Sequence, residues 1–250
     1  MLIDIDIVKG RPVPAGHLRA VVALAYHNEP FSSCSGTLIA EDMVLTAAHC
    51  VCGYPPDRIF VGYDMKVTNG GSFVPASGWR AAYRCGVDTA ATGVDIAILK
   101  VSRTKVTPMT AAPDALIQRA NWLRIVGFGA TDIDGERFED RKLESAVPVT
   151  SIDCPRDVAE EAGCQVGEEI VAGTLGGPDT CSGDSGGPIL ISDRGGAGEY
   201  GEGMFRIAGV TSRGIDGEGT ICGRGGVYER LTPAVWNWVS QAQRSLRRGT

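Results

Sequence analysis

Apolar residues in this chain occur in short runs, and each run is bounded by glycine, proline, aspartate or asparagine. Short apolar runs with turn residues at both ends are typical of β-strands joined by tight turns. The glycine-rich segment Asp193–Gly203 predicts a hairpin loop. The strands predicted by this pattern are Val21–Ala25, Thr37–Ala40, Met43–Thr46, Arg58–Val61, Ile96–Val101, Leu123–Val126, Ile189–Ser192, Ile207–Thr211 and Gly226–Tyr228.

Only one segment, Pro233–Arg247, has a convincing helical pattern. Val235, Trp238, Val239 and Leu246 recur at near-helical spacing. Arginines gather at the end of this segment, where positive charge is favourable at a helix C-terminus. The chain is therefore expected to be almost entirely β-structure, with one helix at its C-terminal end.

Composition adds limits on function. The chain has 250 residues, which is enough for a sizeable core, and its 34 glycines suit many tight turns. The formal net charge of −6 argues against binding to nucleic acid or to an anionic membrane surface. The apolar runs are far shorter than the ~20 residues that cross a bilayer. No internal repeat or low-complexity segment stands out.

The segment Asp179–Pro188 reads DTCSGDSGGP and suits neither a core strand nor a helix. Glycine permits the backbone angles of a tight turn and lets another group approach the main chain. Such a turn can expose the Ser185 hydroxyl while backbone N–H groups converge near it. The alternative is a glycine-rich surface loop with an inert serine, but the six-residue run GDSGGP is rare by chance.

A serine hydroxyl needs a base to take its proton. The chain offers His17, His27 and His49, and only His49 ends an apolar strand, in the run LTAAHC. The other two lie in polar, turn-rich sequence and are expected in loops. Asp95 opens the apolar strand DIAILKV, where a carboxylate is costly without a partner. A structural role is the alternative for Asp95, but its context predicts an acid that orients His49.

The order of His49, Asp95 and Ser185, in the contexts TAAHC, DIAIL and GDSGGP, resembles the chymotrypsin/trypsin family of serine endopeptidases. The resemblance runs from about Ile7 to the segment Leu231–Arg247. It implies an all-β fold of two antiparallel six-stranded β-barrels with a C-terminal α-helix.

The resemblance also implies one peptidase domain with three parts. Residues 1–6 form a leader or activation segment, 7–119 the first barrel with the linker between barrels, and 120–250 the second barrel and helix. The barrels are expected at about Ile7–Pro108 and Ala120–Thr232, joined by Thr110–Arg119. His49 and Asp95 would come from the first barrel and Ser185 from the second, so the chemistry would lie in the cleft between them.

The chemistry implied by the family is acyl transfer. Ser185 attacks the scissile carbonyl, His49 moves the proton, and Asp95 orients His49. The N–H groups of Gly183 and Ser185 form the oxyanion hole, and Ser212 donates a hydrogen bond to Asp95. The mechanism needs no metal and no organic cofactor.

Specificity is implied by Asp179, which stands at the position that forms the floor of the family's primary pocket, where an aspartate resembles trypsin. A carboxylate there binds Arg or Lys side chains, so the expected partners are peptides and proteins with Arg or Lys before the scissile bond. The alternative is a solvated aspartate in a Gly-Pro turn. Arg213 departs from the family's tryptophan and is expected to place a cation beside the substrate path. The implied substrate-binding residues are Asp179, Thr180, Ser212, Gly214 and Gly226.

Two disulfides follow from the resemblance directly, Cys34–Cys50 beside the histidine and Cys181–Cys222 beside the pocket. Closing the first loop stabilises the fold by roughly 3 kcal/mol on the loop-entropy model. Together with the remaining cysteines they argue for an oxidising compartment, secreted or periplasmic. The chain shows no signal peptide at Met1, so a cytoplasmic location is the alternative.

Two further disulfides depart from the trypsin pattern. Cys154 matches a family cysteine, but Val171 stands at its usual partner's position, so Cys164 is the expected substitute. Cys52 and Cys85 have no trypsin equivalent and are expected to form a fourth bridge between loops near the cleft. A zinc site is the competing interpretation, and the spacing of these cysteines fits it poorly.

The segment IVKG at Ile7 resembles the family's activation sequence, in which a freed isoleucine ammonium pairs with the aspartate beside the nucleophile, here Asp184. The preceding Asp6 is not a residue that a trypsin-like enzyme cuts after, so an activating protease specific for Asp is expected; a leader that is not native is the alternative. Asp132–Lys142 resembles the autolysis loop, so self-cleavage is expected there. The alternative functions are a narrow regulatory protease acting on one partner protein and an inactive protease-like binding protein.

Overall fold

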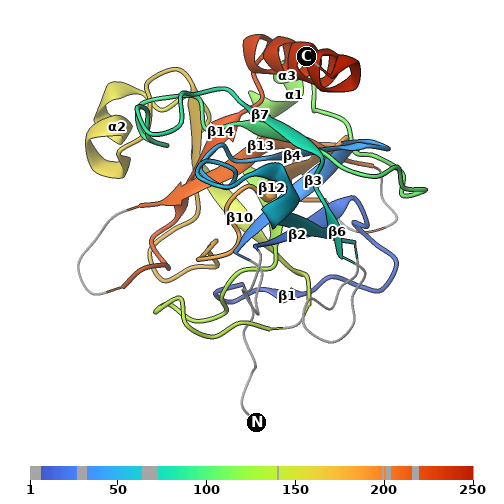
Figure 1. Cartoon of the computed structure of the whole chain (residues 1–250). Helices are drawn as coiled ribbons and strands as arrows, with labels where there is room; N and C mark the ends of the chain where they lie inside the picture. Colours follow the sequence, from blue (N-terminus) through green and yellow to red (C-terminus); the bar gives the residue numbers. More distant parts are fainter. Residues whose placement is uncertain are drawn as a thin grey trace.

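Six strands of the second half of the chain form a closed antiparallel barrel (Figure 1). The computed structural model describes residues 7–26, 33–63, 73–139, 141–198, 200, 204–215 and 220–249, so His27 and the leader 1–6 lie outside the described residues. The barrel strands, in hydrogen-bonded order, are β9 (Trp122–Gly127), β10 (Leu143–Ser151), β11 (Glu169–Ala172), β14 (Gly226–Arg230), β13 (Phe205–Gly214) and β12 (Pro188–Ser192). β12 pairs back to β9, which closes the ring, and β1 (Arg11–Pro12) adds to β10.

The first half forms a second antiparallel sheet. Its order is β6 (Phe73–Pro75), β5 (Ile59–Gly62), β2 (Val21–Tyr26), β3 (Cys34–Ala40), β4 (Met43–Thr46), β8 (Ala97–Lys100) and β7 (Gly78–Ala81). The edge strands β6 and β7 follow each other along the chain. Between them, the N–H of Ala76 donates to Ile59 and that of Ser77 to Lys100. This bent segment joins the two edges, and counted as one strand it gives the six strands expected.

Each predicted strand overlaps a strand of the structure, but β1, β6, β7, β10 and β11 were not predicted. β10 begins beside the buried Lys142 and contains the buried Glu144, and β11 begins with the buried Glu169. Charged residues inside these strands hide the apolar pattern. The hairpin between β12 and β13 is present, because the Asp193 N–H donates to the Met204 carbonyl.

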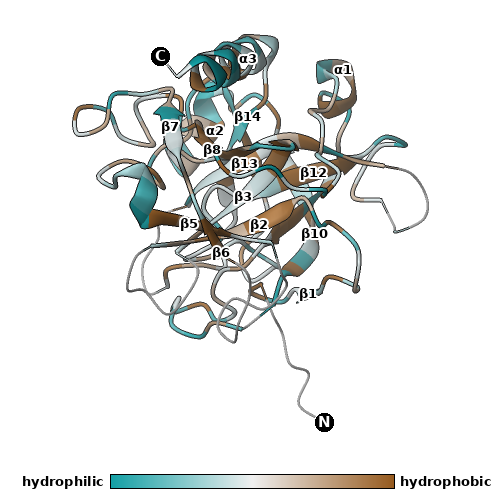
Figure 2. Cartoon of the chain, turned by 45° about the vertical axis from the view of Figure 1, so that its right-hand side comes forward, coloured by the Kyte–Doolittle hydropathy of each residue, from teal (hydrophilic) through white to brown (hydrophobic). Residues whose placement is uncertain are grey.

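The predicted C-terminal helix is α3 (Pro233–Arg248), and it covers the first sheet (Figure 1). The Thr232 side chain accepts the Val235 N–H and caps its first turn. Its apolar residues pack into the core below, and the Lys100 side chain donates to the Leu246 carbonyl at 3.0 Å. Its outer face is largely hydrophilic (Figure 2).

Three shorter helical segments were not predicted: the 3-10 helix η1 (Pro56–Arg58), α1 (Asp114–Ile117) and α2 (Arg156–Ala162). Each is too short to show helical periodicity in the sequence. α1 falls in the segment expected to link the barrels. Among the described helices, none is long and apolar enough to span a membrane.

Candidate functional site

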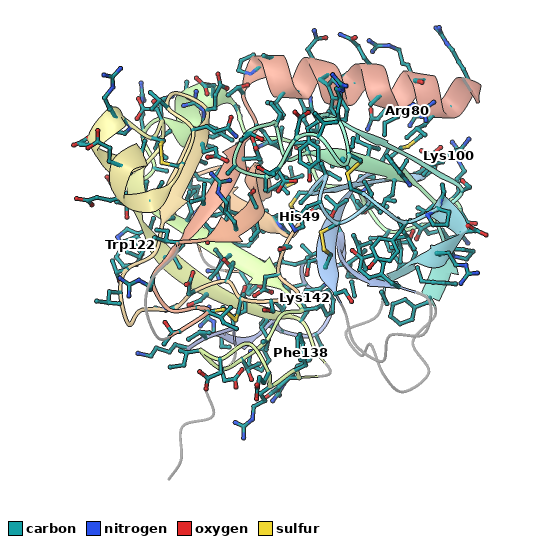
Figure 3. The ribbon with its side chains drawn as sticks, turned by 60° about the vertical axis from the view of Figure 1, so that its left-hand side comes forward. His49, Arg80, Lys100, Trp122, Phe138 and Lys142 are labelled. Carbon is teal, nitrogen blue, oxygen red and sulfur yellow. A yellow bond between two sulfur atoms is a disulfide. The ribbon has the colours of Figure 1, made fainter. Side chains whose placement is uncertain are left out.

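His49 and Asp95 come together because their strands are neighbours. β4 ends three residues before His49, and β8 begins two residues after Asp95, with Thr46 paired to Ala97. The His49 ring nitrogen Nδ1 lies 2.7 Å from Asp95 Oδ2, and the His49 backbone N–H donates to Oδ1 at 2.9 Å. Asp95 is fully buried, whereas the His49 side chain is 33% exposed. His49 lies between the two halves of the molecule (Figure 3).

The buried Asp95 carboxylate is held in its ionised form. Burial by itself raises the pKa of a carboxyl group, but hydrogen bonds from His49 and Ser212 outweigh it and lower the Asp95 pKa. Ser212, on β13 of the second barrel, donates from Oγ to Asp95 Oδ2 at 2.7 Å. The structure therefore brings Ser212 and Asp95 together from the two halves of the chain.

The loop that carries Ser185 is docked against the first sheet. Ser35 on β3 donates its N–H to the Ser185 carbonyl at 2.7 Å and its hydroxyl to the Gly183 carbonyl at 2.9 Å. Gly186 has a φ of +81°, and an added Cβ would lie 2.0 Å from Thr46 Oγ1. Only glycine fits there, because the backbone of the loop packs directly against β4, the strand that leads to His49.

The backbone N–H groups of Gly183 and Ser185 make no hydrogen bond to any residue that the structure describes. Gly183 has a φ of +94°, a left-handed conformation that suits glycine. The carbonyls of both residues accept hydrogen bonds from Ser35, which fixes the Gly183–Asp184 and Ser185–Gly186 peptide units. The half-buried Ser185 is thus presented on a braced turn.

Asp179 is buried under a loop of backbone donors. Its Oδ2 accepts the N–H groups of Gly223 at 2.7 Å and of Arg224 and Gly225 at 3.1 Å each, and its Oδ1 accepts that of Thr180. Burial raises the Asp179 pKa, and these four hydrogen bonds oppose that rise.

The predicted pocket walls lie on two paired strands. Gly214 on β13 lies opposite Gly226 on β14, and Gly214 is exposed. A Cβ on Gly226 would come within 3.0 Å of the Tyr228 hydroxyl and of Thr180 Oγ1, so a side chain there would crowd the buried end. The predicted pocket residues therefore share one region of the second barrel.

Asp184, next to Ser185, is fully buried, and its two oxygens accept the N–H groups of Gly129 and Cys181. Burial, together with the nearby Asp179, raises the Asp184 pKa to about 7. Ile7 is also fully buried, in the core of the second barrel. The next residue, Val8, accepts the Asp179 N–H through its carbonyl at 3.1 Å, so the predicted activation segment is packed beside the predicted pocket.

All four predicted disulfides are present, namely Cys34–Cys50, Cys52–Cys85, Cys154–Cys164 and Cys181–Cys222. The cysteines are therefore disulfide-bonded, and the zinc interpretation is wrong for them. Cys52–Cys85 connects the loop that follows His49 to the loop that precedes Asp95. This bridge ties together the two loops that carry the histidine and the acid.

The expectation for Arg213 is corrected by the structure. Its guanidinium makes two hydrogen bonds of 2.7 Å to the two oxygens of the fully buried Glu169, so its charge is paired and is not free beside a substrate path. The buried Glu229, one strand away, accepts the Asp95 N–H at 2.6 Å. Neither glutamate was singled out in the sequence, although each is an acid in an apolar strand, the same signal that identified Asp95.

The expected self-cleavage segment is only partly accessible. Lys142 is 1% exposed, and its ammonium donates to the Leu18 carbonyl at 2.6 Å. Burial lowers the Lys142 pKa to about 7, assisted by repulsion from Arg19. The Lys142 side chain is therefore inaccessible to a protease pocket in this conformation, while Arg137 is exposed. Lys142 lies below His49 in Figure 3, inside the molecule.

Comparison with known proteins gives a consistent result. The family profile described as Trypsin matches residues 7–239. A trypsin of Saccharopolyspora erythraea is 32% identical over 204 residues, covering 79% of this chain and 82% of that protein. Human serine protease 56 is 33% identical over 94% of this chain, and phenoloxidase-activating factor 3 of Holotrichia diomphalia is 29% identical over 83%.

This chain covers 38% of serine protease 56 and 63% of the phenoloxidase-activating factor, so it spans only part of those two relatives. The profile match, by contrast, covers nearly the whole chain, and the two-barrel architecture agrees with it. The chain belongs to the trypsin family and is a serine endopeptidase.

Proposed function

We propose that this protein hydrolyses peptide bonds after Arg or Lys, using Ser185 as nucleophile, His49 as general base and acid, and Asp95 to orient His49. One observation carries the proposal. The His49–Asp95 pair of the first barrel and the Ser185 turn of the second are held together by hydrogen bonds that cross between the barrels, from Ser212 to Asp95 and from Ser35 to Ser185.

The first chemical step follows from this geometry. Asp95 accepts the Nδ1–H of His49, which leaves the other ring nitrogen, Nε2, as the acceptor for the Ser185 proton. Ser185 Oγ attacks the scissile carbonyl, and the developing oxyanion binds the N–H groups of Gly183 and Ser185. Losing one such donor typically costs about 2.7–4 kcal/mol of transition-state stabilisation. His49 then protonates the leaving amine, and water hydrolyses the acyl-enzyme by the same route.

Asp179 is proposed to select the cationic side chain. Backbone N–H groups hold its carboxylate at the buried end of the proposed specificity pocket, whose walls include Gly214 and Gly226. Since burial raises its pKa, the ionised form is favoured when a substrate guanidinium or ammonium supplies a positive charge.

Activation is proposed to occur by cleavage before Ile7. The new α-ammonium would supply a cation for the buried Asp184, whose raised pKa reflects the cost of ionising it with backbone donors alone. An activating protease is the partner this step requires. The four disulfides favour an oxidising compartment, so we propose a secreted protein.

The test compares two forms, the full-length chain and one that begins at Ile7, each with a Ser185→Ala control. Peptides with Arg, Lys, Phe or Asp before the scissile bond are supplied to each. The proposal predicts fast cleavage after Arg and Lys only in the Ile7 form. Equal activity in both forms would refute activation at Ile7, and cleavage after Phe would refute the role of Asp179.

A narrower function is the second candidate, because one relative is named for activating phenoloxidase. A regulatory protease would cleave the generic peptides poorly and one protein cleanly. If Ser185 reacted with a serine-directed inhibitor while all peptides stayed intact, this candidate would replace the first. An unreactive Ser185 in both forms would favour an inactive binding protein.

A further inference from the structure

Three charged residues of the second barrel, Glu169, Arg213 and Glu229, form a cluster that reaches Asp95 of the first barrel. We call this cluster the charged clasp. Glu169 on β11 and Glu229 on β14 lie directly opposite each other in the sheet, and they are 0% and 1% exposed. Arg213 on the adjoining strand β13 binds both oxygens of Glu169 at 2.7 Å.

The clasp holds the backbone of Asp95. Glu229 Oε1 accepts the Asp95 N–H at 2.6 Å, a hydrogen bond that crosses from one barrel to the other. A carboxyl oxygen has lone pairs that can accept a backbone N–H whether the group is ionised or protonated. The position of the Asp95 main chain is thereby fixed by a residue that the first barrel does not contain.

The clasp also controls the side chain of Asp95, through Ser212. Arg213 Nη1 donates to Ser212 Oγ at 3.2 Å, and Ser212 Oγ donates to Asp95 Oδ2 at 2.7 Å. A hydroxyl has one proton, and a donor on its lone pair leaves that proton directed at the remaining acceptor. Arg213 therefore orients the Ser212 hydroxyl toward the acid.

Stability alone does not favour such a cluster. Two glutamates face each other in a dry sheet with one guanidinium nearby, and like charges directly opposite are destabilising. Burial, with Glu169 and Asp95 close by, raises the Glu229 pKa to about 8. Apolar residues of the same volume are often at least as stable as a buried ion pair, so a positional role is the better account.

We propose that the charged clasp positions Asp95, and through Asp95 orients His49, so that the first barrel's acid and base stay in register with Ser185 of the second. The inference rests on the proposed catalytic function of Asp95, His49 and Ser185. Glu229, Arg213 and Glu169 are positioning residues, because none of them touches the reacting atoms.

The central test is a pair of substitutions at Glu229. Glu229→Gln keeps an oxygen that can accept the Asp95 N–H, whereas Glu229→Ala removes it. The readout is the rate at which a small fluorophosphonate labels Ser185 in the Ile7 form, since this reaction needs no pocket specificity. We expect Glu229→Ala to label about tenfold more slowly or worse, and Glu229→Gln to stay within about threefold of wild type.

Arg213 is tested with its partner, because Arg213→Met alone leaves a buried carboxylate unpaired and can prevent folding. The double variant Glu169→Met/Arg213→Met removes both charges together. We expect it to fold and to label Ser185 about tenfold more slowly or worse.

Glu144→Ala is the matched control. Glu144 is fully buried on β10 of the same barrel and pairs with the buried Arg124 at 2.9 Å, but none of its described partners is Asp95, His49 or Ser185. We expect this variant to lose thermal stability while labelling within about threefold of wild type. Equal loss of labelling in Glu144→Ala and Glu229→Ala, or normal labelling in Glu229→Ala, would overturn the proposal.

A second readout separates this inference from the proposed function. The proton on His49 Nδ1, which is hydrogen-bonded to Asp95, gives a low-field NMR resonance that can be observed without any substrate. If wild-type Ser185 were not labelled at all, the proposed function would fail, and this resonance would still test the clasp. An unchanged resonance in Glu229→Ala would overturn the inference, and its loss with recovery in Glu229→Gln would support it.

Discussion

The buried carboxyl of Asp184 makes a quantitative prediction about the pH dependence of folding. Its described partners are two backbone N–H groups, and its pKa is raised from 3.8 to about 7 in the folded full-length chain. The folded chain thus binds this proton more tightly than the unfolded chain does. The stability contributed by the group is fully present below about pH 4 and is lost as the pH rises to about 7.

The magnitude follows from the shift. A rise of about three pKa units, at about 1.4 kcal/mol each, amounts to about 4 kcal/mol in all. Because pH 5 lies about two units below the raised pKa, about 2–3 kcal/mol of this should be lost between pH 5 and pH 8. Asp184→Asn cannot ionise, so it should lack this part of the pH dependence.

The assay is urea unfolding of the full-length chain, followed by tryptophan fluorescence at several pH values with the disulfides intact. The parent chain and the Asp184→Asn variant both carry Ser185→Ala to prevent self-digestion. We expect the difference in unfolding free energy between these two chains to change by about 2–3 kcal/mol from pH 5 to pH 8. The same comparison in the form that begins at Ile7 should show much less change, because the α-ammonium then pairs with the ionised carboxyl.

A stability difference that stays constant across this range in the full-length chain would refute the reasoning. It would mean that Asp184 has an ordinary pKa when folded, and that a cation already accompanies it before cleavage. A large pH dependence in both forms would instead show that the Ile7 ammonium does not reach Asp184.

Three further predictions concern the pocket, the cleft and the nucleophile turn. Asp179→Ala should lower kcat/KM for Arg and Lys peptides by about 10²-fold or more while sparing Phe peptides, and equal losses for all peptides would argue against Asp179 as the specificity residue. Replacing Cys52 and Cys85 together by serine should lower the free energy of unfolding by up to about 3.7 kcal/mol, the loop-entropy value for a separation of 33 residues, and an unchanged denaturation midpoint would contradict this. Gly186→Ala should abolish Ser185 labelling, because its Cβ would lie 2.0 Å from Thr46 Oγ1 in a left-handed backbone; normal labelling would show that the turn can shift away from β4.

The residues of the proposed triad could be found from the sequence because each lies in a short, distinctive run. His49 ends an apolar strand, Asp95 begins one, and Ser185 sits among glycines, so each signal is local. Glu169, Arg213 and Glu229 could not be found in this way. They come from three strands, and only the pairing of β11, β14 and β13 places them together.

The same distinction explains the fold predictions. Strands such as β2, in which all six residues are buried, were predicted well. β10 was missed because the charged residues at and just before its start have partners distant in sequence. Arg124 forms an ion pair with Glu144, and the Leu18 carbonyl accepts a hydrogen bond from Lys142. Sequence analysis predicts that a charged residue is exposed, unless the partner that allows its burial is known.

The helix α3 has a consequence for how the chain reaches its folded state. It comes last in the sequence, yet it covers the sheet formed first, with contacts from Leu246 to Lys100 and from Arg247 to Asp42 that span 146 and 205 residues. During synthesis, part of the apolar surface of the first sheet therefore stays exposed until the second barrel and then α3 have been synthesised. Contacts between residues so far apart in the sequence slow folding, and the uncovered first sheet is prone to aggregation until they form. The sheet that carries His49 and Asp95 is completed only by the last helix, so activity should appear at the end of folding and not as each half forms.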